Sequence, residues 1–92
     1  MECSPPTPCV SEFFGISIYF YFVDHPPPHF HACYGEHEAL IEISSLRIIR
    51  GSLPPRAYGL VVEWGLANRH ALTRAWQQAA AAQRIDRIDP LR

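Results

Sequence analysis

Three of the five histidines in this 92-residue chain fall within a short stretch, at His25, His29 and His31. A proline triplet, 26–28, separates the first histidine from the second. Because proline fixes φ and lacks an amide donor, this segment is predicted to form a rigid extended turn and not a helix. If a strand begins at Phe30, side-chain alternation places His29 and His31 on one face of a sheet. The stretch therefore predicts a site without defining its chemistry.

One chemistry open to these side chains is metal coordination. The imidazoles of His25, His29 and His31, with the carboxylate of Glu38 on a neighbouring strand, are ligands that zinc-like divalent transition metals accept. A catalytic zinc site needs three such ligands and an open position. The His-x3-His-x-His spacing matches no standard metal motif, so a metal site is one hypothesis among three.

A second hypothesis is proton transfer without a metal, in which His29 and His31 act as the catalytic acid and base. An arginine such as Arg47, Arg50 or Arg56 would then hold a phosphate group. This arrangement suits cleavage of an RNA backbone, where the ribose 2′-hydroxyl is the nucleophile and the protein moves protons. The commoner role for such arginines is a solvated or salt-bridged rim.

The third hypothesis is an interaction surface. Tyr19 and Tyr21 would lie beside the histidines on an open sheet face, and a sheet with unpaired edges can bind another chain. Tyrosine and arginine are residues that protein interfaces favour. This pattern predicts a small cognate protein partner or self-association, and it is compatible with the other two hypotheses.

Composition narrows the class of protein. The formal net charge of −1 argues against nucleic-acid binding through bulk electrostatics, although all eight basic residues are arginine, which can pair with phosphate locally. A hydrophobic content of 48% predicts one folded domain, and no apolar run approaches the length of a membrane span. The three cysteines are odd in number and follow no secretory signal, which predicts a cytoplasmic protein.

The hydrophobic pattern predicts an α+β fold, a small, mostly antiparallel sheet of about four strands with two C-terminal helices packed on one face. Alternation predicts the strands 13–23, 30–34, 38–44 and 46–50. Two apolar stripes at helical spacing follow Pro54 and Pro55, with a break near 68–70. The stripes are Ala57, Leu60, Val61 and Trp64, then Leu72, Ala75, Trp76 and Ala79.

The predicted helices must cover the more apolar sheet face. That face carries Ile16, Ile18, Phe20, Phe22, Phe30, Ala32, Ile41 and Ile43. The open face is then predicted to collect Tyr19, Tyr21, His29, His31, Glu38 and Glu42. The predicted organisation is a flexible leader over 1–8, a single α+β domain over 9–84 and a C-terminal tail over 85–92.

Several motifs resemble the small bacterial family catalogued as domain of unknown function 4160. They are Phe13-Phe14-Gly15-Ile16, Asp24-His25, Pro27-Pro28-His29-Phe30-His31-Ala32 with Tyr34, Gly51-x-Leu53-Pro54-x-Arg56-Ala57, and Glu63-Trp64 with Leu72 and Trp76. The resemblance runs from about Pro8 to the end of the second predicted helix. Pro26 and the residues before Pro8 depart from the family pattern.

The resemblance implies no established activity. Members of the family look like products of small two-gene modules in which a toxin–antitoxin role is suspected. This implies a bacterial, cytoplasmic protein that acts on RNA or binds a partner through its histidine face. His25, His29 and His31 match the family signature and are therefore the expected site positions.

Overall fold

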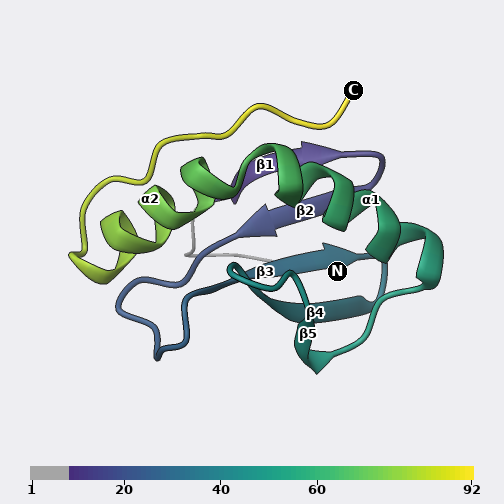
Figure 1. Ribbon diagram of the computed structural model, residues 1–92, viewed down its shortest axis with the longest axis horizontal. Coiled ribbons are helices and arrows are strands. Elements are labelled where there is room, and N and C mark those ends of the chain that lie inside the picture. The colour runs from purple at the N-terminus through teal and green to yellow at the C-terminus, as the bar shows by residue number, and fades with distance from the viewer. Residues whose placement is uncertain (1–8) are drawn as a thin grey trace.

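The computed structural model describes residues 9–92 and contains a five-stranded antiparallel sheet and two helices (Figure 1). The strands are β1 (Cys9–Phe13), β2 (Ile16–Tyr19), β3 (His29–Tyr34), β4 (His37–Glu42) and β5 (Ile48–Gly51). The helices are α1 (Pro55–Ala67) and α2 (Arg69–Ala80). Each strand pairs with its neighbour in sequence, in the order β1-β2-β3-β4-β5. The predicted α+β class is confirmed, and the predicted leader, 1–8, lies outside the described residues.

The strand count is five and not four, because residues 9–13, which precede most of the predicted first strand (13–23), form an additional strand that pairs with β2 as a hairpin. Phe13 pairs with Ile16, so Phe14 and Gly15 form a two-residue turn. Both turn residues have positive φ, 49° for Phe14 and 80° for Gly15. This backbone matches the twist of an antiparallel pair, which is why hairpins of this length favour it. Cys9–Phe13 therefore precedes β2 and lies beside it as an edge strand of the sheet.

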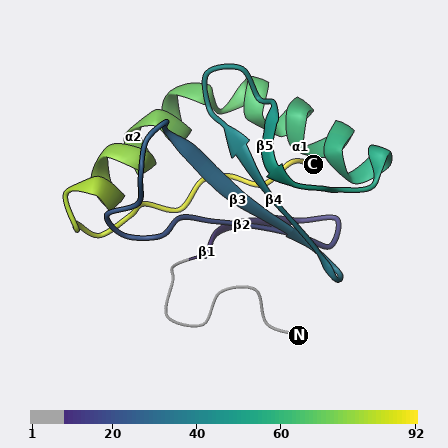
Figure 2. The same cartoon turned by 90° about the horizontal axis from the view of Figure 1, so that it is seen from below.

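The two helices cover one face of the twisted sheet, and the hydrophobic core lies between the two layers (Figure 2). The fully buried large side chains include Ile16, Ile18, Phe20, Phe30, Ile41, Val61, Trp64 and Leu72. The residues predicted to face the helices are therefore in the core, with one exception. Phe22 follows the end of β2 and its side chain is 44% exposed.

Local sequence explains where each helix begins and ends. Pro55 occupies the first turn of α1, where a missing amide hydrogen carries no cost. The predicted break is confirmed at Asn68, which ends α1 and precedes α2. The Asn68 side chain donates a hydrogen bond to the Trp64 carbonyl, and the backbone carbonyl of Asn68 accepts one from the Leu72 amide. Within residues 9–92, neither helix is long and apolar enough to cross a membrane.

The segment after α2 contains no regular element but packs on the domain. It runs back past the helices toward β1 (Figure 1). Ile85 and Ile88 are buried, and the Ile88 amide donates a hydrogen bond to the carbonyl of Val10 in β1. The indole N–H of Trp64 donates to the carbonyl of Asp89. The predicted tail, 85–92, therefore packs against the core through Ile85, Ile88 and Leu91.

The histidine-bearing face is not the open surface that alternation predicted. Tyr19 is fully buried, and His29 and His31 are each 4% exposed. Tyr21 and Glu38 do reach solvent. Alternation places a side chain on one face of a sheet but does not show whether a loop or a neighbouring ring covers it.

Candidate metal centre

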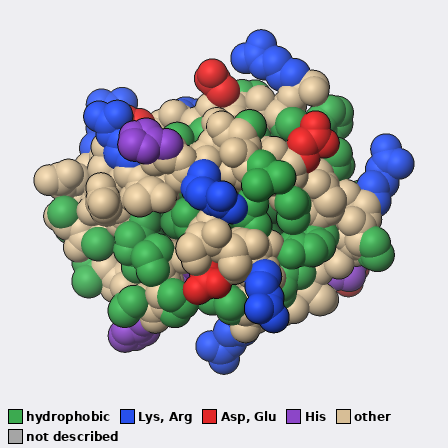
Figure 3. Space-filling model, viewed as in Figure 1, with side chains coloured by type: hydrophobic (Ala, Val, Ile, Leu, Met, Phe, Trp, Pro, Cys, Tyr) green, Lys and Arg blue, Asp and Glu red, His purple; other side chains and the backbone are tan. Residues whose placement is uncertain are grey.

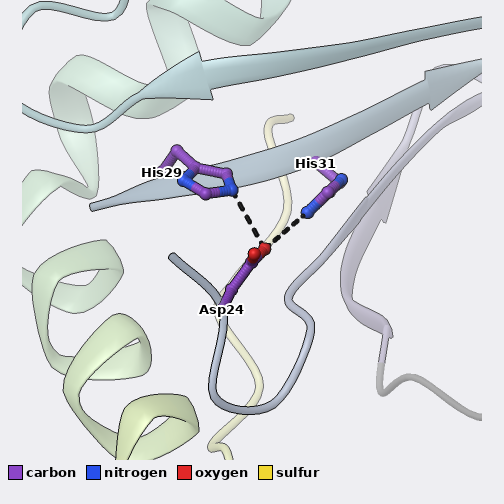
Figure 4. Close-up of side chains that lie close together, drawn as sticks. All are labelled: Asp24, His29 and His31. Carbon is purple, nitrogen blue, oxygen red and sulfur yellow. Dashed lines mark hydrogen bonds and ion pairs between the residues drawn. The ribbon is translucent and has the colours of Figure 1, made fainter. Parts of the chain in front are cut away.

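Asp24, His29 and His31 converge on one point at the start of β3 (Figure 4). The two histidines lie two positions apart on β3, so their rings share one face of the sheet. The Asp24 Oδ2 atom lies 3.0 Å from His29 Nε2 and 3.2 Å from His31 Nε2. The Asp24 side chain is 18% exposed and each histidine side chain is 5% exposed. The cluster is therefore mostly removed from water.

The loop between β2 and β3 carries Asp24 back onto the strand. The Val23 amide donates a hydrogen bond to the carbonyl of Ala79 near the end of α2, at 3.0 Å. On the other side of the loop, the Ile43 amide donates to the Pro28 carbonyl. The loop also contains a cis peptide bond between Pro26 and Pro27. The position of Asp24 thus depends on the last turn of α2 and on the residue following β4.

The hydrogen bonds of His29 leave one ring nitrogen facing a negative charge. Its Nδ1 lies 2.7 Å from the Pro27 carbonyl oxygen, which can only accept, so Nδ1 carries a proton. Its Nε2 faces Asp24 Oδ2, which is also an acceptor when the carboxyl is ionised. A neutral imidazole would therefore direct a lone pair at a carboxylate. This geometry requires either a second proton or a cation at Nε2.

Aromatic rings hold His31 in place. The Tyr19 ring stacks on it, with centroids 5.1 Å apart, and the Tyr21 ring lies 4.2 Å away. His31 Nδ1 lies 3.5 Å from Glu38 Oε2 and is a buried nitrogen without a hydrogen-bond partner in the described part of the chain. The Tyr19 hydroxyl donates to the same carboxylate of Glu38. Glu38 thus lies behind His31, on the side away from Asp24.

Two pKa shifts accompany this arrangement. Burial opposes ionisation of Asp24, but the hydrogen bond from the His25 amide and the interactions with His31 and His29 outweigh it. The pKa of Asp24 is therefore below its ordinary value, which favours the carboxylate form. Burial, followed by the hydrogen bond to Glu38, raises the pKa of Tyr19 far above the ordinary value, so this phenol stays protonated.

The structure brings some of the predicted metal ligands together and leaves others apart. His29 and His31 belong to the cluster. The side chain of His25 is exposed, and this residue contacts Asp24 through its backbone amide. Glu38 faces Nδ1 of His31 and is not one of the three converging ligands. Sequence reasoning missed Asp24, although this carboxylate directly precedes the histidine and proline stretch.

The predicted phosphate or partner contacts are dispersed. Arg50 lies on β5 and lines the grooves beside the cluster, whereas Arg47 is exposed before β5 begins. Arg56 lies in the first turn of α1 and lines a different hollow with Phe14 and Tyr34. On the helix side of the molecule, the arginines stand apart from one another and form no continuous basic patch (Figure 3). Of these three arginines, Arg50 is the one that the fold places next to the histidines.

Fold and site together define a small α+β protein with a buried cluster of two histidines and one carboxylate. The family model described as domain of unknown function, DUF4160, matches residues 15–77, and the chain belongs to this family. The family expected from the motifs is thereby confirmed. No curated protein and no solved structure matches the chain significantly.

Proposed function

We propose that this protein binds a divalent transition metal through Asp24, His29 and His31. The observation that carries the proposal is the position of Asp24 Oδ2 between two imidazole Nε2 atoms. Two ligand atoms on one metal ion, each at the usual bond length, are separated by about 3.0–3.4 Å. The 3.0 Å and 3.2 Å separations from Asp24 fit that range.

The surroundings of the cluster also support a metal. Metal-bound histidines commonly donate the other ring N–H to a carbonyl or a carboxylate, which orients the ring. His29 Nδ1 donates to the Pro27 carbonyl, and Glu38 lies beside Nδ1 of His31. A cation would also remove the conflict between the His29 lone pair and the carboxylate.

The ligand set defines the kind of metal. Two imidazoles and one carboxylate suit zinc, iron(II), nickel or manganese, and disfavour copper(I), which prefers sulfur ligands. Three protein ligands leave coordination positions open for water or a small ligand. A metal bound in this way supplies Lewis-acid activation of whatever occupies those positions.

The biological setting is a second proposal, which rests on the family resemblance. We infer a role in a toxin–antitoxin-like module of the bacterial cytoplasm, in which the site acts on RNA or binds a partner protein. Tyr21 and Arg50 line the groove beside His31, and these residue types are favoured at interfaces and on RNA-binding surfaces. The net charge of −1 favours contact with a few nucleotides over binding along an extended stretch of nucleic acid.

The test is metal binding by chelator-treated full-length protein, titrated with zinc(II) and cobalt(II). We expect one ion per chain, and a gain of about 2.7 kcal/mol in unfolding free energy at a free metal concentration one hundred times the Kd. Asp24→Asn and His31→Ala should lose the ion. Asp89→Asn and His70→Ala alter exposed side chains outside the cluster and should keep it.

Circular dichroism of each variant shows whether it is folded, and Asp24→Asn preserves the shape of the side chain. A wild-type protein that binds neither ion with micromolar affinity would overturn the metal proposal. RNA cleavage by the wild type that persists in chelator and disappears in His31→Ala would instead support proton transfer by His29 and His31.

A further inference from the structure

Arg50 shares a row of the sheet with the histidine cluster. The Cα partners across four strands are Tyr19, His31, Leu40 and Arg50. Residues paired in this way project to the same face of a sheet. Since Arg50 lies two strands from His31, their Cα atoms are about 10 Å apart. A long guanidinium side chain can bridge much of that distance toward the candidate metal centre.

Two grooves meet at Arg50 and Leu40. One has a volume of about 400 Å³ and is also lined by Tyr21, His31 and Glu38. The other has a volume of about 300 Å³ and is also lined by Asp24 and His29. Each of the three candidate ligands therefore lines one of the two grooves that Arg50 also lines. Volumes of this size can hold a small molecule.

The guanidinium of Arg50 is available for a ligand. Across residues 9–92, it forms no ion pair or hydrogen bond. The carboxylate that lines the larger groove with Arg50 belongs to Glu38, which already accepts the Tyr19 hydroxyl and faces His31. An exposed, unpaired arginine is common on protein surfaces, but here it lines both grooves beside the cluster.

We propose that Arg50 binds an oxyanion, the phosphate or carboxylate group of a small ligand, beside the metal held by Asp24, His29 and His31. This inference rests on the proposed metal-binding function. A guanidinium presents parallel N–H donors that match such a group, and the metal offers a second positive charge with open positions. The weak overall charge favours a small ligand over a long nucleic-acid chain.

The experiment uses the cobalt(II)-loaded protein, with inorganic phosphate and acetate as separate probes. The visible spectrum of cobalt changes when an anion enters its coordination sphere, and this gives a Kd for each probe. We expect Arg50→Gln to weaken binding of the preferred anion at least tenfold, and Arg50→Lys to weaken it less. Arg74→Gln removes the same charge at an exposed position on α2 and should leave the Kd unchanged.

Cobalt stoichiometry is measured first in every variant. Loss of cobalt binding by the wild type would be a failure of the proposed function, whereas cobalt binding without any anion effect would overturn the role of Arg50 alone. Equal anion affinity in the wild type and Arg50→Gln would overturn it as well. Preference for phosphate or for acetate identifies the oxyanion. A different result would be a short RNA that binds more tightly than phosphate or acetate, with its binding weakened equally by Arg47→Gln, Arg50→Gln and Arg56→Gln. That result would overturn the small-ligand assignment.

Discussion

The ring of Tyr19 stacks on the ring of His31, with centroids 5.1 Å apart and planes inclined by 16°. Tyr19 is fully buried, and its hydroxyl donates to Glu38, whose Oε2 lies 3.5 Å from His31 Nδ1. One tyrosine therefore contacts both the face of the histidine ring and the carboxylate at its outer nitrogen. Tyr19 is therefore a positioning residue for the candidate metal centre, and it acts through two contacts, the ring stack on His31 and the hydrogen bond to Glu38.

Replacing Tyr19 with Phe separates these two contacts. The ring stack remains, but Glu38 loses its hydrogen-bond donor. We expect a loss of about 1 kcal/mol in unfolding free energy, measured by urea denaturation, and zinc binding weakened up to about tenfold. Tyr34→Phe, on the other face of β3 and partly exposed, is the control and should change neither quantity. Wild-type zinc affinity in Tyr19→Phe would contradict the positioning role.

The stability of the protein should fall in alkaline solution because of Tyr19. Burial and the hydrogen bond to Glu38 raise the pKa of Tyr19, so the folded protein holds this proton more tightly than the unfolded chain. The resulting stability is complete below the ordinary tyrosine pKa of about 10 and is lost as the pH rises toward the folded value. Urea denaturation between about pH 8 and about pH 11 measures this, and Tyr19→Phe should show a shallower decline. If the unfolding free energy falls equally steeply with pH in the wild type and in Tyr19→Phe, Tyr19 is not the cause of the alkaline loss of stability.

Gly51 and Gly59 form a matched pair for alanine substitution. Gly51 has φ of 77°, and a Cβ there would overlap the Glu38 carbonyl oxygen, inside the β4–β5 pairing. We expect Gly51→Ala to cost about 2–4 kcal/mol in unfolding free energy. Gly59 lies within α1, where a Cβ would extend into open space, so Gly59→Ala should stabilise by about 0.5–1 kcal/mol. Equal denaturation midpoints for Gly51→Ala and Gly59→Ala would contradict the predicted difference in stability.

Most of the fold was predictable because hydrophobic periodicity determines it locally. Alternation identified Ile16, Ile18 and Phe30 as core residues, and helical spacing identified Trp64 and Leu72. The first hairpin was not predictable in this way. The predicted strand begins at residue 13 and so leaves out most of Cys9–Phe13, and positive φ at a non-glycine residue such as Phe14 is uncommon, so the turn before β2 was not expected.

The candidate site was predictable only in part. Placement of His29 and His31 on one face follows from strand alternation alone. Recruitment of Asp24 depends on contacts distant in sequence, since the amide of Val23 binds the carbonyl of Ala79. No local pattern in the proline-rich loop specifies that contact, and the loop also directs the His25 side chain to solvent.

Deleting 85–92 tests the predicted domain boundary at residue 84. The structure buries Ile85 and Ile88 and gives the Trp64 indole N–H its acceptor at Asp89. Removal exposes core surface and leaves a buried donor unpaired, so we expect a loss of about 3 kcal/mol or more in unfolding free energy. Urea denaturation gives the value. An unchanged midpoint would establish 9–84 as the complete stable domain.

His25→Ala and His29→Ala test whether the metal ligands are those of the structure or those of the sequence motif. The side chain of His25 is exposed and its contact with Asp24 uses the backbone amide, which alanine retains. We therefore expect His25→Ala to bind zinc with an affinity within about threefold of the wild-type value. The zinc affinity of His29→Ala should be lower by about one hundredfold or more. Isothermal titration with zinc measures both, and circular dichroism confirms that each variant is folded. Equal losses in the two variants would mean that the loop turns His25 inward when the metal binds, and the metal would then have the three histidines as ligands.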